Sequence, residues 1–168
     1  ESIIFSEDSE RLAYAAETDS GWIVVIDSVS GRSWDGIAEL QFGPGQQCAY
    51  VAKDSGRWRV VHDENPGSSF EAVMKGSLAF SPNGKQLAFV AAEGQGSRVV
   101  VNGKAGPVFE GIGTLRFSPN GDRLAYAAKK DGHQYLVSDH HQLGPFQSLA
   151  DFTLGMNGEL GLLVRDQG

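Results

Sequence analysis

The chain has 168 residues, with 14 Lys and Arg against 21 Asp and Glu, and a net charge of −7. This charge has the wrong sign for a groove that neutralises phosphates, so we expect no nucleic-acid partner. The apolar runs, such as residues 22–26, are far shorter than the roughly 20 residues of a membrane helix. We therefore expect no membrane insertion.

The chain length permits a packed core, since about 70% of the unfolded surface can be buried in one domain of this size. Cys48 is the single cysteine, so an intrachain disulfide is excluded. The cysteine content therefore does not distinguish an oxidising from a reducing compartment. The chain begins at Glu1 and not at a methionine, which favours a processed or trimmed polypeptide.

Four kinds of short apolar run follow one another along the chain and then recur. The first run ends at Phe5 and recurs with ends at Phe42, Phe80, Phe117 and Leu154, at spacings of 37, 38, 37 and 37. The second, RLAYAA at 11–16, recurs at 47–52, 86–92, 123–128 and 159–164. The third, WIVVID from 22, recurs from 58, 97 and 134, and the fourth, WDGI from 34, recurs from 70, 109 and 146.

These runs are rich in Val, Ile, Tyr, Phe and Trp and are bounded by Gly, Pro, Asn, Asp or Ser, which predicts strands between turns. No segment shows helical periodicity, so the chain is predicted to be all-β. The second run is nearly continuous in apolar residues, which indicates that both faces of each sheet are covered. We expect a single domain over 1–168, with repeats of approximately 2–38, 39–76, 77–113 and 114–151 and a partial repeat at 152–168.

The turn between the first and second runs reads SPNG at 81–84 and again at 118–121. Ser opens such a turn, Pro pre-sets φ, and Gly accepts the positive φ that closes a hairpin. Weaker versions stand at 6–10, 43–46 and 155–158, with Ser9 in place of the glycine. Hairpins with a four-strand period near 37 predict a radial stack of four-stranded blades.

The segments LAFSPNGKQLAFVA (78–91) and LRFSPNGDRLAYAA (115–128) carry a family likeness. The chain resembles the TolB-like, WD-repeat-like β-propeller family. The resemblance implies a β-propeller of four-stranded antiparallel blades, four full repeats plus half of a fifth, used for binding. It also implies a bacterial protein of the periplasm or cell envelope. It carries over no catalytic residue and no cofactor or metal.

Several residues allow both a functional and a structural interpretation. Asp139, His140 and His141 resemble part of a metal site but lack spaced partners, which favours an exposed loop. The recurrent polar position ending the third run looks like a ring of carboxylates, but Asx turns explain it better. Its members are Asp27, Asp63, Asn102 and Asp139. The acidic residues after the fourth-run aromatic, Asp35, Glu71 and Glu110, are expected at solvated sheet edges, and Cys48 is expected in the core.

The position before each first-run aromatic varies, and in propellers the first strand lines the central channel. Gln41, Arg116 and Thr153 are therefore the polar residues expected to meet a ligand or water there. The alternative is that Arg116 pairs with a carboxylate or extends its charged group to one end of the channel. The loops at one rim form a mixed-charge surface suited to a protein partner. That surface comprises Asp19, Glu39, Lys53, Asp54, Lys75, Lys130, Asp131 and Asp151.

Two functions remain open from the sequence. The first is a non-catalytic scaffold that binds a protein or peptide through one rim. The second is a small-ligand-binding or enzymatic propeller with a site at the channel mouth, although the first strands supply no pair of carboxylates. The apolar strand expected at 160–164 has no following strands in this sequence, so we expect an exposed edge. Either this edge pairs with a second copy in a homodimer, or the chain is a fragment of a longer propeller.

Overall fold

The computed structural model describes residues 3–139 and 141–165 of the chain. The chain forms two compact units, Glu1–Leu78 and Ala79–Gly168. Within the described residues no helix is long and apolar enough to cross a membrane.

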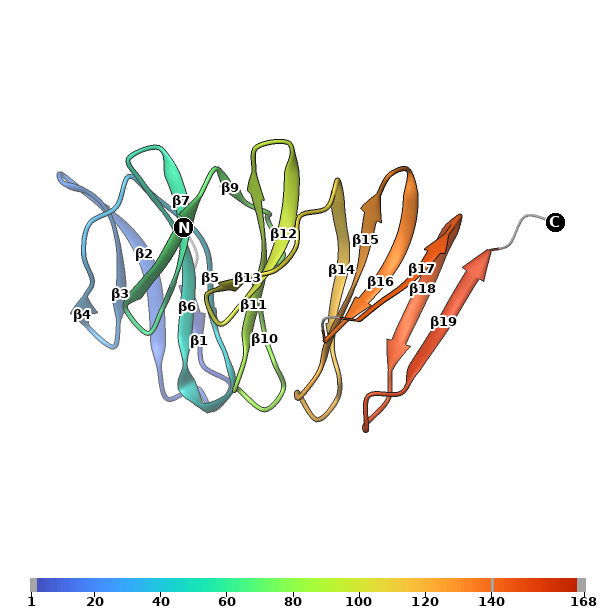
Figure 1. The fold of residues 1–168 in the computed structure, drawn as a ribbon. Helices are drawn as coiled ribbons and strands as arrows, with labels where there is room; N and C mark the ends of the chain where they lie inside the picture. Colours follow the sequence, from blue (N-terminus) through green and yellow to red (C-terminus); the bar gives the residue numbers. More distant parts are fainter. Residues whose placement is uncertain (1–2, 140, 166–168) are drawn as a thin grey trace. The chain divides into compact units, whose positions relative to one another are not determined.

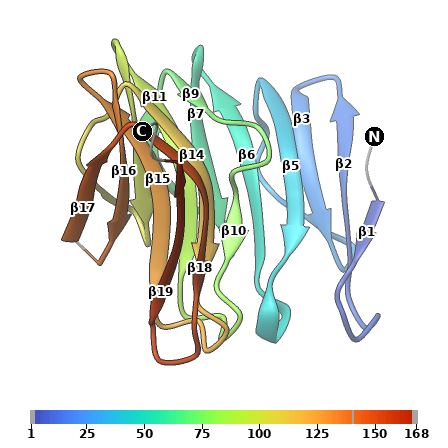
Figure 2. The same ribbon diagram turned by 90° about the vertical axis from the view of Figure 1, so that its right-hand side faces the viewer.

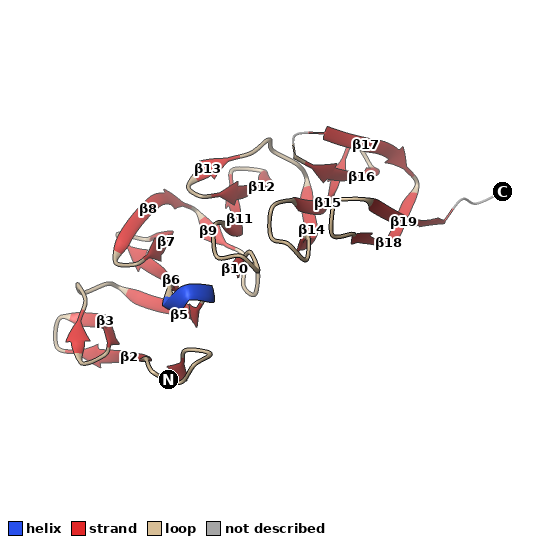
Figure 3. Cartoon of the chain, turned by 90° about the horizontal axis from the view of Figure 1, so that it is seen from below, coloured by secondary structure: helices blue, strands red, loops and turns tan. Residues whose placement is uncertain are grey.

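The first unit contains two four-stranded antiparallel sheets, drawn from blue to green in Figure 1. The sheet of repeat 1 consists of β1 (Ile3–Phe5), β2 (Leu12–Thr18), β3 (Gly21–Ile26) and β4 (Val29–Ser30). The sheet of repeat 2 consists of β5 (Gly36–Phe42), β6 (Cys48–Asp54), β7 (Arg57–His62) and β8 (Asn65–Phe70). The short 3₁₀ helix η1 (Pro44–Gln46) lies in the turn between β5 and β6 (Figure 3), and β9 (Ala72–Val73) follows β8.

The second unit repeats this arrangement twice and then adds a pair of strands (Figure 2). Repeat 3 consists of β10 (Ala79–Phe80), β11 (Leu87–Glu93), β12 (Gly96–Val101) and β13 (Lys104–Ala105). Repeat 4 consists of β14 (Gly111–Phe117), β15 (Leu124–Lys130), β16 (His133–Ser138) and β17 (His141–Phe146). Repeat 5 is the two-stranded sheet of β18 (Ser148–Leu154) and β19 (Leu160–Arg165).

The fourth apolar run of each repeat is a junction and not a complete strand. In repeat 1, Trp34 bridges Trp22 of β3, whereas Gly36 already begins β5 of the next sheet. Phe109 bridges Ser97 in the same way before β14 begins at Gly111. The fourth strands lie earlier, where the sequence is poor in apolar residues. Sequence patterning missed them because an outer strand packs on few neighbours.

The SPNG turns have the predicted backbone. Gly84 and Gly121 have φ of 69° and 76°, and Ser81 and Ser118 are fully buried. Each serine hydroxyl donates to the Asn two residues later and accepts the amide five residues later, which closes the turn without an unsatisfied buried hydroxyl. The same position keeps a positive φ in the degraded turns, at 59° for Ser9.

Within each unit the apolar core lies between consecutive sheets, as the covered faces of the second strands predicted. Leu124, Tyr126 and Ala128 of β15 pack toward repeat 3, while Ala125 packs toward β18 of repeat 5. Successive residues of a strand point to opposite faces, so both faces of the sheet are buried. Ala13, Ala49, Ala88 and Ala125 are each 0% exposed. Small side chains at this position allow neighbouring sheets to approach closely.

Candidate functional site

A groove lies between repeats 1 and 2 of the first unit. It has a volume of about 590 Å³ and is open to solvent. One wall is formed by the end of β3 and by β4, including Ile26 and Val29. The opposite wall is formed by the β7–β8 turn, with Asp63 and Glu64, and Cys48 lies at the base.

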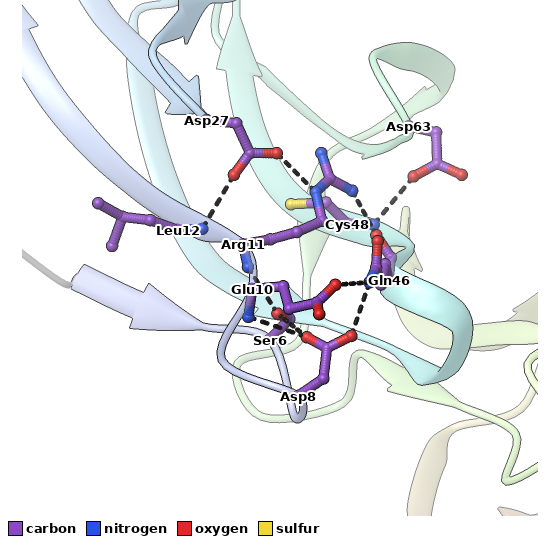
Figure 4. A network of polar contacts seen from close by, with 9 residues as sticks. All are labelled: Ser6, Asp8, Glu10, Arg11, Leu12, Asp27, Gln46, Cys48 and Asp63. Atoms are coloured by element: carbon purple, nitrogen blue, oxygen red, sulfur yellow. Dashed lines mark hydrogen bonds and ion pairs between the residues drawn. The ribbon is translucent and has the colours of Figure 1, made fainter.

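A polar network includes several of the residues that line the groove, among them Arg11, Asp27 and Gln46 (Figure 4). The Arg11 guanidinium pairs with Asp27 at 2.6 Å and donates a second hydrogen bond to the Gln46 carbonyl at 2.5 Å. The Gln46 amide donates to Asp8 at 2.6 Å. These contacts join the first-to-second-strand turns of two neighbouring repeats. The bond from Arg11 holds the pKa of Asp27 below its usual value. Hydrogen bonds from the Ser6 hydroxyl and then from Gln46 lower the pKa of Asp8 to about 2.

Cys48 differs from the residue at the equivalent position of the other repeats. The equivalent residue is leucine in every other repeat, at positions 12, 87, 124 and 160. The smaller thiol leaves space that a leucine would fill. Cys48 is 1% exposed, and burial raises the pKa of its thiol to about 12. The thiol is therefore protonated and unreactive at neutral pH, which agrees with its predicted place in the core.

Glu64 reaches from the β7–β8 turn toward repeat 1. A Cβ placed on Gly31 would lie 2.6 Å from its carboxylate, so the absence of a side chain at Gly31 gives it room. The carboxylate also lies near the buried hydroxyl of Tyr50, whose pKa is raised to about 12 by burial and then by the charge of Glu64. The Trp34 indole lies on the other side of that hydroxyl. Neither neighbour makes a hydrogen bond of normal geometry with it.

A corresponding groove of about 320 Å³ lies between repeats 3 and 4 in the second unit. Its lining residues occupy equivalent positions: Asn102 corresponds to Asp27, Lys104 to Val29 and Leu124 to Cys48. The same backbone positions thus line both grooves, and the side chains at these positions differ from one pair of repeats to the other.

Two of the three polar residues predicted to line a channel donate hydrogen bonds to backbone carbonyls outside their own strands. Gln41 donates to the Leu78 carbonyl at 3.2 Å within the first unit. Arg116 donates to the Phe152 carbonyl, lies 5.0 Å from the centre of the Phe152 ring and pairs with Asp151 at 2.9 Å within the second unit. Thr153 is exposed in β18 opposite Gly161. The polar groups of Gln41 and Arg116 are therefore engaged by the protein itself.

The predicted rim residues are divided between the two units, with five in the first and three in the second. Asp54 pairs with Arg32 at 3.3 Å and Arg59 at 3.4 Å, and the Glu39 carboxylate accepts the Gly76 amide. Lys53 lies 5.6 Å from the centre of the Trp58 ring. The remaining members are Asp19, Lys75, Lys130, Asp131 and Asp151. The sequence assigned Asp151 to the rim and Arg116 to the channel, but the structure joins them in one ion pair.

The recurrent Asp or Asn at the end of each third strand has a structural role. Asp27, Asp63 and Asn102 each adopt a positive φ of 45–48°. Each side chain accepts the first backbone amide of the second strand, from Leu12, Cys48 and Leu87 respectively, at 2.9–3.0 Å. The bond thus spans two strands and is less local than an Asx turn. Asp35 and Glu110 were predicted as edge charges, but they accept the turn amides of Ser55 and Asp131.

The histidine segment gives no metal centre in the described residues. His141 is exposed at the start of β17, Asp139 pairs with Arg123 at 3.3 Å, and His140 lies outside the described residues. No group of three or more His, Cys, Asp or Glu side chains gathers around a common point in the part of the chain that the structure describes.

Sequence reasoning missed the contribution of Arg11, Gln46 and Glu64 to the groove. These residues are far apart in sequence and come together only because two repeats pack side by side. One signal was present. Cysteine at the position where the other repeats have leucine indicated a locally smaller core between these repeats.

No family model matches the sequence, and no curated protein matches it. Solved structures are similar to the chain in fold. A eukaryotic initiation factor aligns with a TM-score of 0.58 and 12% identity, over 93% of this chain and 45% of that one. TolB from Acinetobacter baumannii aligns with a TM-score of 0.47 and 17% identity, over 97% of this chain and 49% of that one. The WD40 β-propeller domain of Doa1 aligns with a TM-score of 0.37 and 13% identity, over 95% of this chain and 73% of that one.

The chain spans about half the length of the first two structures. At these identities the similarity shows the fold alone. The described residues form β-propeller blades: three four-stranded antiparallel sheets, one sheet of four strands with β9 as a fifth, and a two-stranded part of a further blade.

Proposed function

We propose that the chain is a non-catalytic scaffold that binds a protein or peptide. One observation carries this proposal: the repeats build grooves on a constant frame whose lining residues differ. Repeat proteins that use variable side chains on a constant frame are suited to recognising extended partners. The mixed charges predicted at the rim support the same function, because interface edges are polar and accessible.

Selection from a random peptide library displayed on phage, with the purified chain immobilised, tests this proposal. We expect enrichment of related sequences that bind the free chain saturably and remain chemically intact after incubation. A scaffold without peptide affinity would give no convergent sequences. Cleavage or modification of the bound peptide would contradict the non-catalytic assignment.

The second candidate, a small-ligand or enzymatic site built on Gln41, Arg116 and Thr153, has weaker support. Gln41 and Arg116 already bond to backbone carbonyls, and a ligand would have to displace those contacts. Displacing a protein hydrogen bond without an equally good replacement costs free energy.

We also propose that β19 pairs with a second copy of the chain. Among the described strands β19 pairs with β18, and Leu163 and Val164 are 62% and 42% exposed. An exposed apolar strand with free backbone groups is a template for pairing with another chain.

A further inference from the structure

We infer that the groove between repeats 1 and 2 binds the cationic side chain of an extended, basic segment of a partner polypeptide. The inference deepens the proposed function and rests on it, since it assigns one site and one ligand chemistry to a peptide-binding scaffold. It also differs from the rim surface predicted from the sequence, because none of the rim residues lines the groove.

The charges lining the groove are unbalanced. Three carboxylates, of Asp27, Asp63 and Glu64, face one guanidinium, that of Arg11. Arg11 is already paired with Asp27 and bonded to the Gln46 carbonyl. Asp63 accepts the Cys48 amide, and its second oxygen lies 3.5 Å from a ring nitrogen of His62. The negative charge of Asp63 and Glu64 is thus available to a cation entering the groove.

Buried polar groups next to Glu64 provide a second, independent indication of a ligand. Tyr50 is 1% exposed and Trp34 is 3% exposed, yet the Tyr50 hydroxyl and the Trp34 indole nitrogen lack hydrogen-bond partners within the described residues. Buried polar atoms are nearly always paired, and here the hydroxyl has only the indole and the Glu64 carboxylate as loose neighbours, so it retains hydrogen-bonding capacity for a further group. The Tyr50 hydroxyl lies beside the carboxylate of Glu64, which lines the first groove, and Tyr126, the equivalent of Tyr50, lines the groove of the second unit.

The shape and apolar wall of the groove fit a long basic side chain. Its volume of about 590 Å³ exceeds that of any single side chain and leaves room for flanking peptide. Ile26 and Val29 form an apolar wall, and Val29 is 71% exposed. Arg and Lys carry an apolar stem below the charged group, and the stem packs on apolar surface while the charge meets a carboxylate.

The groove of the second unit lacks this chemistry. It has one lysine, Lys104, against one aspartate, Asp139, and Leu124 occupies the space that Cys48 leaves open. Recognition of a cation is therefore expected at the first groove and not at the second.

The test is a titration of the full chain with two matched probes, followed by NMR and calorimetry. The first is an acetylated, amidated heptapeptide, Gly-Ser-Leu-Arg-Leu-Ser-Gly. The second has citrulline in place of arginine, which keeps the shape and removes the charge. We expect saturable binding of the arginine peptide, at least tenfold weaker binding of the citrulline peptide, and weakening by added salt.

Three variants locate the site. Asp63→Asn with Glu64→Gln removes both charges, and asparagine at position 63 keeps the amide acceptor that Asn102 provides in repeat 3. We expect this double variant to weaken binding at least tenfold. Cys48→Leu fills the groove with the residue found at the equivalent positions and should weaken binding as well. Glu17→Gln with Glu71→Gln, at two exposed positions that do not line the groove, changes the net charge equally and should leave binding unchanged.

Equal binding of the two peptides, or no saturable binding up to millimolar concentration, would overturn the inference. It would also be overturned if the control pair weakened binding as much as the groove pair. A library selection that yields peptides without basic residues, insensitive to Asp63→Asn with Glu64→Gln, would leave the scaffold function standing and remove this site from it. A selection that yields no peptides would instead count against the scaffold function.

Discussion

At the scale of single residues, Gly121 combines two constraints that can be separated experimentally. Its φ is +76°, and a Cβ there would lie 2.7 Å from the backbone nitrogen of Asn83 in the neighbouring repeat. Gly103 has the same φ but nothing within 4 Å of that position. We expect Gly103→Ala to cost about 1 kcal/mol from the backbone alone and Gly121→Ala to cost about 1–3 kcal/mol more, since backbone must also shift.

Urea-induced unfolding of the two variants beside the unaltered chain measures this difference. Equal destabilisation by the two substitutions would show that Asn83 shifts away from the added Cβ without a cost in free energy. The loss of stability would then come from the left-handed backbone alone.

Asp8 is predicted to contribute to stability in a defined pH window. Hydrogen bonds from Ser6, Gln46 and the Glu10 amide lower its pKa from 3.8 to about 2 in the folded chain. The folded state therefore favours the ionised carboxylate, so the stabilisation is complete well above pH 3.8 and is lost as the pH falls toward 2. Asp8→Asn should destabilise the chain at pH 6 and have a much smaller effect at pH 2.

Unfolding curves at the two pH values, with carboxyl-carbon NMR titration, test this prediction. The control is Glu7→Gln, which alters the adjacent exposed position in the same turn. Titration of Asp8 near 3.8, or an effect of Asp8→Asn that is independent of pH, would contradict it.

The sequence predicted the positive φ of Gly84 and Gly121 because only glycine adopts it without cost. It did not predict that Ser9 and Gln46 adopt the same conformation, at φ of 59° and 65°. A contact with the neighbouring repeat holds Gln46, whose side chain bonds to Asp8 of repeat 1. Ser9 is held within its own turn, where its amide donates to the Ser6 carbonyl.

At the scale of elements, Arg116 links β14 to β18 through two kinds of contact. In the ion pair with Asp151, the Arg116 side chain is 40% exposed and the Asp151 side chain is 59% exposed. The pair is therefore expected to contribute only about 0–1 kcal/mol to the free energy of unfolding. The hydrogen bond to the Phe152 carbonyl is partly buried, and leaving that carbonyl unpaired costs about 1–3 kcal/mol. We therefore expect Arg116→Met to destabilise the chain more than Asp151→Asn.

Urea-induced unfolding of the two single variants and the double variant measures both destabilisations and the coupling between them. The coupling between the two substitutions should be below about 1 kcal/mol, as for exposed ion pairs. A destabilisation by Asp151→Asn as large as that by Arg116→Met would show that the ion pair dominates.

The order and type of the strands followed from the sequence, but the position of the fourth strand did not. The second and third strands are strongly patterned because both of their faces are buried, as for Val24 and Val60. β8 and β17 contain Pro and Gly and are largely exposed, so their residues carry little pattern. The aromatic that closes each repeat was visible, and it was interpreted as the strand itself.

At the scale of the whole molecule, self-association through β19 gives a concentration-dependent prediction. Light scattering should show a mass that rises above 18.0 kDa as the concentration increases. Leu163→Lys should keep the chain monomeric, since a charge at an apolar edge opposes strand pairing. Leu143→Lys, at an exposed position on β17, is the control and should associate as the unaltered chain does. A constant 18.0 kDa up to millimolar concentration would rule out this pairing.

The sequence by itself determined the strand content, the period near 37 and the SPNG turns, because these depend on local backbone preferences and on a pattern that every repeat restates. The tertiary structure alone decided what lies between the repeats. Arg11, Glu64 and Tyr50 belong to three separate segments, and no local preference relates them. Packing of one sheet on the next brings them together around the buried Cys48 side chain.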